Sequence, residues 1–110
     1  MSAPACLFFY GLRFEVPAAE RILLEKKLHP MMKRAIEGGL GVHWHDFGGS
    51  EERYYLFVGR KLAEIGVEGE LGARFTDGEL AAQAEEVALK LKAAGLPGDP
   101  TYWLRWQPES

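Results

Sequence analysis

The chain has 110 residues, of which 47% are hydrophobic and 26% are charged, and its formal net charge is −3. These proportions are those of an ordinary globular domain, so they exclude a disordered tail, a collagen-like chain and a low-complexity linker. The length predicts a single domain over residues 1–110 with one core. The acidic balance makes nucleic acid an unexpected partner, because nucleic-acid-binding domains usually carry a basic surface.

The single cysteine, Cys6, can form no disulfide within the chain, which favours a reducing compartment. We expect Cys6 to be a small apolar strand residue and not a nucleophile. The apolar run from Cys6 to Tyr10 is too short for a signal peptide, and no run approaches the ~20 apolar residues of a transmembrane helix. A cytoplasmic protein without membrane contact is therefore predicted.

Residues 7–16 alternate between two sets of side chains, and both sets are apolar in the first half of the segment. This pattern predicts a central strand. A helical pattern follows and is interrupted by Pro30, since proline lacks the amide donor of a helix and disfavours helix at the residue before it. We expect two short helices, at about 18–28 and 31–37.

Two further strands are expected at 42–47 and 53–58, around a five-residue loop with two glycines that is typical of an antiparallel hairpin. The second of these strands is apolar on both faces, so it is also expected to be central. Residues 59–75 contain four glycines among sparse apolar residues. The sequence leaves open whether they form a loop, a strand or a helical turn.

Thr76 and Glu79 have the spacing of a capping box and predict the start of a second main helix, which Gly95 ends. The last strand is expected at 102–107. The order strand, helix, strand, strand, helix, strand is that of ferredoxin-like folds. We therefore predict an α+β fold, a ferredoxin-like βαββαβ sandwich with the first and third strands central and both helices on one face of a four-stranded antiparallel sheet.

The helices of such a fold leave one face of the sheet open. Either choice of face for the central strands puts several aromatic rings there, and exposed apolar patches usually mark an interaction site. The alternative is that residues 59–75 fold across this face and cover it. Aromatic and arginine side chains dominate interface energetics. The predicted binding surface consists of Phe9, His43, His45, Tyr55, Phe57, Trp103 and Arg105.

The leading interpretation is a non-catalytic domain that forms a homodimer or binds a protein partner through this face. The alternative is an enzyme or small-ligand binder with a pocket between the sheet and residues 59–75, to which His43, His45, Tyr55 and Arg105 would contribute polar groups. The sequence contains no Gly-x-Ser-x-Gly elbow and no Walker-type loop. No catalytic residue and no cofactor are predicted.

His43 and His45 lie on the same side of a predicted strand, because strand side chains repeat every second residue. This spacing suits two metal ligands, but zinc, iron or nickel would need a third. His29 is the remaining histidine, and its position at a helix break gives no reason to place it near the pair. We therefore predict no metal site.

A third hypothesis is binding of single-stranded RNA. One strand resembles the third-strand signature of the RNA-recognition motif at Arg53, Tyr55, Phe57 and Val58. The resemblance covers about a strand and a half, and it implies that Phe8, Tyr55 and Phe57 stack on bases. The chain is not assigned to that family.

Overall fold

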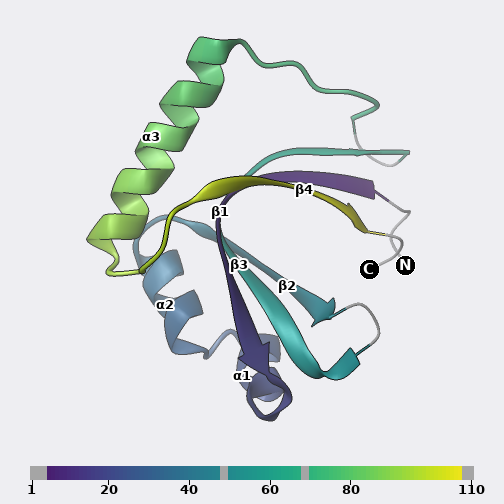
Figure 1. The fold of residues 1–110 in the computed structure, drawn as a ribbon, viewed down its shortest axis with the longest axis vertical. Coiled ribbons are helices and arrows are strands. Elements are labelled where there is room, and N and C mark those ends of the chain that lie inside the picture. The colour runs from purple at the N-terminus through teal and green to yellow at the C-terminus, as the bar shows by residue number, and fades with distance from the viewer. Residues whose placement is uncertain (1–4, 48–49, 68–69, 108–110) are drawn as a thin grey trace.

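The computed structural model describes residues 5–47, 50–67 and 70–107, and within these the side chains of all except 45–47, 50–53 and 107. They form an α+β fold around a four-stranded antiparallel sheet (Figure 1). In chain order the elements are β1 (Ala5–Pro17), the 3-10 turn η1 (Ala18–Glu20), α1 (Arg21–Glu25), α2 (Pro30–Glu37), β2 (Gly41–Phe47), β3 (Ser50–Gly66), α3 (Asp77–Ala93) and β4 (Thr101–Gln107). The strand order is β2-β3-β1-β4, so the first and third strands are central, as predicted.

β3 is much longer than the sequence predicted. It does not end at Val58 but continues to Gly66, and its second half pairs with the N-terminal half of β1. Gly59 lies directly opposite Gly11 of β1. A Cβ atom on Gly11 would lie 2.8 Å from the Cα of Gly59 and would overlap the carbonyl oxygen of Val58. Glycine at this point therefore allows a close approach of two backbones and does not end the strand.

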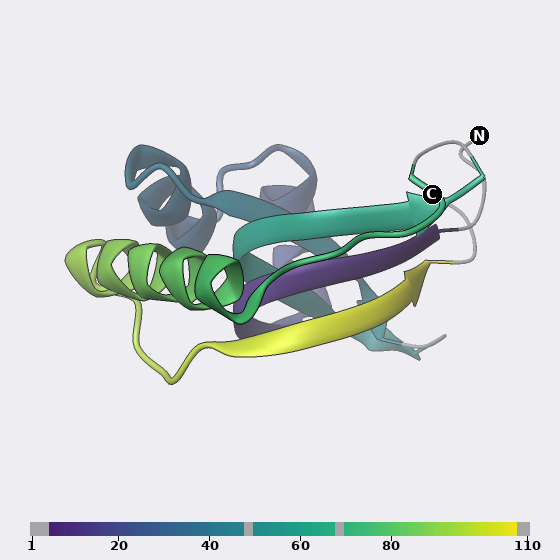
Figure 2. The same ribbon diagram turned by 90° about the horizontal axis from the view of Figure 1, so that it is seen from above.

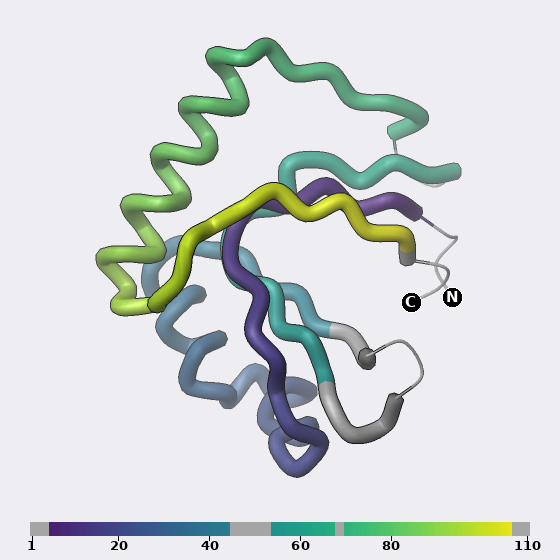
Figure 3. The backbone as a smooth tube through the Cα atoms, in the orientation of Figure 1, coloured from purple at the N-terminus to yellow at the C-terminus, as the bar shows by residue number. Residues whose placement is uncertain are grey.

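The same glycines belong to a row that crosses the whole sheet. Gly41 pairs with Gly59, Gly59 pairs with Gly11, and Gly11 pairs with Thr101. The pairs between β2 and β3 lie on one side of this row, and those between β1 and β4 lie on the other. The two halves meet at a pronounced bend, with the helices outside it (Figures 1 and 3). We call the face inside the bend, which carries Phe57, the concave face.

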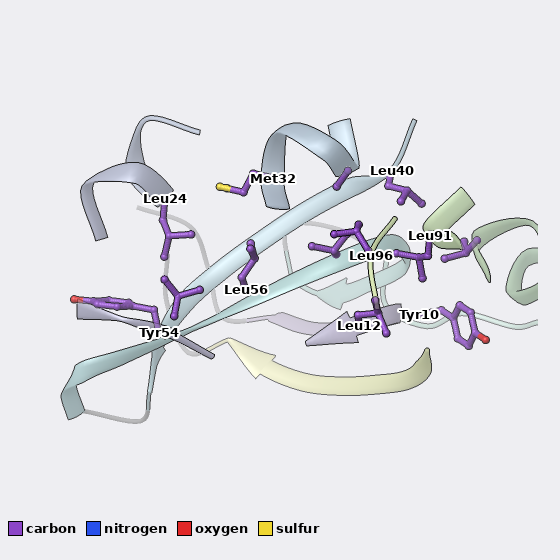
Figure 4. Close-up of a cluster of buried hydrophobic side chains, with 13 residues drawn as sticks. Tyr10, Leu12, Leu24, Met32, Leu40, Tyr54, Leu56, Leu91 and Leu96 are labelled. Atoms are coloured by element: carbon purple, nitrogen blue, oxygen red, sulfur yellow. The ribbon is translucent and has the colours of Figure 1, made fainter. Parts of the chain in front are cut away.

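The main core fills the space between the helices and the other face of the sheet. Leu24 of α1, Met32 of α2 and Val87 of α3 are all fully buried against it, which places the helices on one face. The strand residues of this core alternate along β1 and β3, as the period-two pattern predicted. The buried cluster consists of Tyr10, Leu12, Val16, Leu24, Met32, Ala35, Leu40, Tyr54, Leu56, Val58, Val87, Leu91 and Leu96 (Figure 4).

The break between α1 and α2 is built by His29. Its Nδ1 accepts a hydrogen bond from the amide of Met31 at 3.2 Å, so Nε2 carries the proton and donates to Glu20 Oε1 at 2.8 Å. Pro30 therefore begins α2 at the first helical position, where its missing amide costs nothing. The helix before it is shorter than predicted, because Lys27 adopts a left-handed φ of 57° that ends the helical path.

The predicted cap of α3 is present. The Thr76 hydroxyl accepts a hydrogen bond from the amide of Glu79 at 3.1 Å. The helix is also tied to the second half of β3, because Arg60 donates to both carboxylate oxygens of Glu86, at 2.9 and 3.2 Å, and to Gln83 at 2.6 Å. No helix in the described ranges is long and apolar enough to cross a membrane.

The described residues of the segment 59–75 do not cover the concave face. Residues 59–66 belong to β3, and residues 70–75 return on the helix side, where the ring of Phe75 lies 5.9 Å from that of Phe8. Glu70 makes an isolated parallel bridge to Ile65 beside the end of β3. The ring of Phe75 therefore packs on the side opposite the predicted binding surface, whereas Val67 and Leu71 are exposed.

Candidate functional site

A cluster of rings contributed by all four strands occupies the concave face. Phe57 of β3 lies at its centre, 5.6 Å from Trp103 of β4 and 6.0 Å from Phe9 of β1, between ring centroids. The rings of Tyr55 and His43 each lie 6.3 Å from Phe57. Several of these contacts are edge-to-face, the geometry in which the positive edge of one ring meets the negative face of another. These five residues are called the ring cluster below.

Strand periodicity and register bring the ring cluster together. Phe9, Tyr55 and Phe57 point away from the helices because they alternate with the core residues of their strands. Trp103 pairs with Phe9 across β1 and β4, and His43 pairs with Phe57 across β2 and β3. The indole Nε1 of Trp103 also donates to the carbonyl oxygen of Gly11 at 3.1 Å, which fixes its ring at the bend of the sheet.

The expectation of large exposed rings on this face is wrong for its two central members. Phe57 is only 1% exposed and Phe9 only 3% exposed, although no helix covers them. The physical reason is the bend, which folds the two halves of the sheet toward each other and lets their side chains bury one another. The concave face is therefore a second small core with half-buried Tyr55, Trp103 and His43 at its surface.

Two arginines lie over the ring cluster. The Cζ atom of Arg13 is 4.3 Å from the ring centroid of Tyr55 and 4.7 Å from that of Trp103. The Cζ atom of Arg105 is 5.2 Å from the centroid of Phe57 and 6.0 Å from that of Tyr55. Both are within the distance at which a cation is attracted by the face of an aromatic ring.

The two guanidinium groups influence each other. Burial lowers the pKa of Arg105, and the neighbouring positive charge of Arg13 lowers it further, while Tyr55 acts in the opposite direction. Arginine nevertheless stays charged in proteins. The concave face thus carries two adjacent positive charges on a chain whose net charge is negative.

A hollow of about 320 Å³ adjoins the ring cluster beside the first residues of β2, where β3 continues beyond its pairing with β2. Its polar side chains come from His43, Lys61 and Glu64, and its apolar floor includes Leu7 and Phe9. The complete lining is Leu7, Phe9, Gly41, Val42, His43, Lys61 and Glu64. Hence part of the segment 59–75 does border a cavity, but as a strand of the sheet and not as a lid over it.

The structure brings six of the seven predicted surface residues together. The seventh, His45, pairs with Tyr55 through its backbone, and its side chain lies outside the described residues. The sequence analysis missed Arg13, which shares the odd-numbered side of β1 with Phe9 and could have been found from that spacing. Lys61 and Glu64 were not among the predicted surface residues, because their strand was not recognised.

The structure also places the residues that were considered for RNA binding and for a metal site. Phe8, expected to stack on RNA bases, lies on the helix side, where its ring contacts Phe75 and Tyr102. His29 is occupied as the cap of α2, on the side of the sheet opposite His43. Within residues 5–47, 50–67 and 70–107, no three metal-ligating side chains come together.

Comparison of the chain with protein-family models, with curated proteins and with solved structures finds no match.

Proposed function

We propose that the chain is a non-catalytic binding domain whose concave face binds a carboxylate-rich protein segment. One observation carries the proposal: the guanidinium groups of Arg13 and Arg105 converge on the ring of Tyr55. The N–H donors of a guanidinium group lie in one plane, in a geometry that matches the two oxygens of a carboxylate. Two such groups side by side favour a partner with more than one negative charge.

The residues around the arginines suit a protein partner. Tyrosine, tryptophan and arginine are the residue types that contribute most to binding energy in protein interfaces. The half-buried ring of Tyr55 lies beneath both arginines, and that of Trp103 lies beneath Arg13. Phe57 and Phe9 form a rigid floor beneath them. Side chains that are already fixed lose little conformational entropy when a partner binds, so less of the interaction energy is lost on association.

Two finer predictions about the molecule are also part of this proposal. The order of elements and the strand order β2-β3-β1-β4 support a ferredoxin-like topology, in which η1, α1 and α2 together take the place of the first helix. A lone cysteine supports a reducing compartment, and we place the protein in the cytoplasm.

A small-ligand site is the second candidate, favoured by the hollow beside the ring cluster. Its lining combines the polar groups of Lys61, Glu64 and His43 with the apolar side chains of Leu7 and Phe9. Ligand pockets usually join an apolar floor to a few polar groups in this way. Binding of RNA is not proposed, because two of the three rings expected to stack on bases are displaced or covered: Phe8 faces the helices and Phe57 is buried.

Titration of the protein into a dye-labelled poly-glutamate peptide, followed by fluorescence anisotropy, tests the proposal. Arg13→Gln and Arg105→Gln are each expected to weaken binding by about tenfold or more, since hydrogen bonds to charged groups contribute about 1.5–3 kcal/mol. Binding should also weaken with added salt. Arg34→Gln is the matched control, because Arg34 is an exposed arginine on α2, outside the concave face.

The proposal fails if the wild-type protein does not bind the peptide at low salt. It also fails if the control variant loses as much affinity as the two concave-face variants, because binding would then reflect overall positive charge and not the arginine pair.

A further inference from the structure

The outer strand β4 exposes a row of large apolar side chains. Leu104 is 71% exposed, Trp106 is 62% exposed and Tyr102 is 45% exposed. They alternate along the strand and therefore share the face that carries the helices. α3 contacts Tyr102, whose hydroxyl donates to the carbonyl oxygen of Leu80 at 3.4 Å.

The outer edge of β4 is also open in the part of the chain that the structure describes. β4 is the last strand in the order β2-β3-β1-β4, and among the described residues no strand pairs with its outer edge (Figure 2). Proteins usually guard such an edge with charged residues, a proline or a bulge, because its free backbone groups can pair with another strand. β4 contains one charged residue, Arg105, whose guanidinium lies over the ring of Phe57 on the concave face.

We propose that β4 pairs antiparallel with β4 of a second copy of this chain, about a two-fold axis at Leu104. This register sets Leu104 opposite itself and Tyr102 opposite the Trp106 of the second copy, so the exposed apolar side chains cover one another. On the concave face it sets Trp103 opposite the Arg105 of the second copy, an aromatic–cation pair.

The sequence of β4 favours a second copy of the same strand as the partner, and it favours this register. Leu104 is the central residue of Thr101–Gln107, so an axis there pairs the full length of the strand. An axis at Arg105 would place two guanidinium groups directly opposite each other, which is unfavourable. A strand that is complementary to itself in this way fits a closed two-fold dimer, the commonest form of soluble oligomer.

This inference goes beyond the proposed acidic partner and does not depend on it. The dimer would join the two sheets into one of eight strands, with a concave face on each copy. Peptide binding and dimer formation are separate measurements, so either can fail while the other stands.

Light scattering and cysteine cross-linking test the dimer. We expect wild-type protein to be a dimer, and Leu104→Lys, which sets two charges opposite each other, to raise the dimer dissociation constant by tenfold or more. In a Cys6→Ser background, Leu104→Cys should form a disulfide-linked dimer on oxidation, because directly opposite residues lie within disulfide reach. Tyr102→Cys is the control: it is exposed on the same face of the same strand, but its expected neighbour is Trp106 of the second copy.

Circular dichroism tests whether each variant is folded. We expect all of them to fold, because the substituted side chains, Cys6, Tyr102 and Leu104, are at least partly exposed. A wild-type monomer at the highest attainable concentration would overturn the proposal. So would equal cross-linking through positions 102 and 104, or a dimer that Leu104→Lys leaves intact, since each places the contact away from this register.

Discussion

Truncation of Phe57 tests whether the concave face is a second core or an open platform. The ring is 1% exposed and lies 5.6–6.3 Å from four other rings. Replacing a fully buried phenylalanine by alanine removes its burial and leaves a cavity, at a cost of about 3–5 kcal/mol. We therefore expect Phe57→Ala to lower the free energy of unfolding as much as Leu56→Ala, its fully buried neighbour on the helix side, for which the range is about 2–5 kcal/mol. A domain of this kind has only about 5–15 kcal/mol in total.

Urea unfolding followed by far-UV circular dichroism measures this difference. All proteins are compared at one concentration, because the stability of a dimer depends on concentration. Leu89→Ala on α3, where the side chain is 63% exposed, is the control and should change the unfolding free energy by about 0.5 kcal/mol or less. If Phe57→Ala behaves like this control while Leu56→Ala is strongly destabilised, the ring is not buried in solution and the account of the concave face is wrong.

Three further substitutions test the elements that hold the site in place. In Gly11→Ala the new Cβ would overlap a carbonyl oxygen of β3, so the protein should be destabilised by about 1–3 kcal/mol or more and its melting temperature should fall. Gly72→Ala is the control: a Cβ there has nothing within 4 Å, so the melting temperature should not change. The pKa of Glu86 is lowered to about 2, chiefly by its hydrogen bond with Arg60, so the ion pair stabilises the folded state above pH about 4.5 and this contribution is lost as the pH falls toward 2. The melting temperatures of wild type and Glu86→Gln should therefore differ at neutral pH and converge at pH about 2; a constant difference would contradict this. Thr76→Ala should cost about 1 kcal/mol in urea unfolding through loss of the helix cap, and Thr76→Ser should restore most of it.

Local patterns in the sequence were sufficient for much of the fold. Alternation along residues 7–16 separated Leu12 and Val16, which the structure buries under the helices, from Phe9 on the other side. The capping spacing at Thr76 located the start of α3 to within one residue. Both signals depend on residues close together in the chain, where side-chain direction follows directly from the backbone.

The end of β3 could not be predicted in this way. Gly59 has the local character of a strand terminator, and its actual role depends on Gly11, which lies far away in the sequence and directly opposite in the sheet. The choice of face was open for a similar reason: Tyr54 with Leu56 and Tyr55 with Phe57 are equally apolar pairs. The curvature of the sheet, which leaves Tyr54 and Leu56 buried under the helices and Phe57 buried among rings, is a property of the assembled strands.

The row of glycines also explains how the site is assembled. Trp103 is level with Phe9 along β1, and Phe57 is level with Arg13, four residues further on. In a flat sheet these two rings would stand about 13 Å apart along the strands and about 10 Å apart across them. Their centroids are 5.6 Å apart, because the bend at Gly11 falls between the two levels and turns one half of the sheet toward the other. The same bend places the guanidinium of Arg105 over Phe57. Arg105 and Arg13 therefore lie side by side because Gly11 and Gly59, which have no side chains, let the two backbones approach closely.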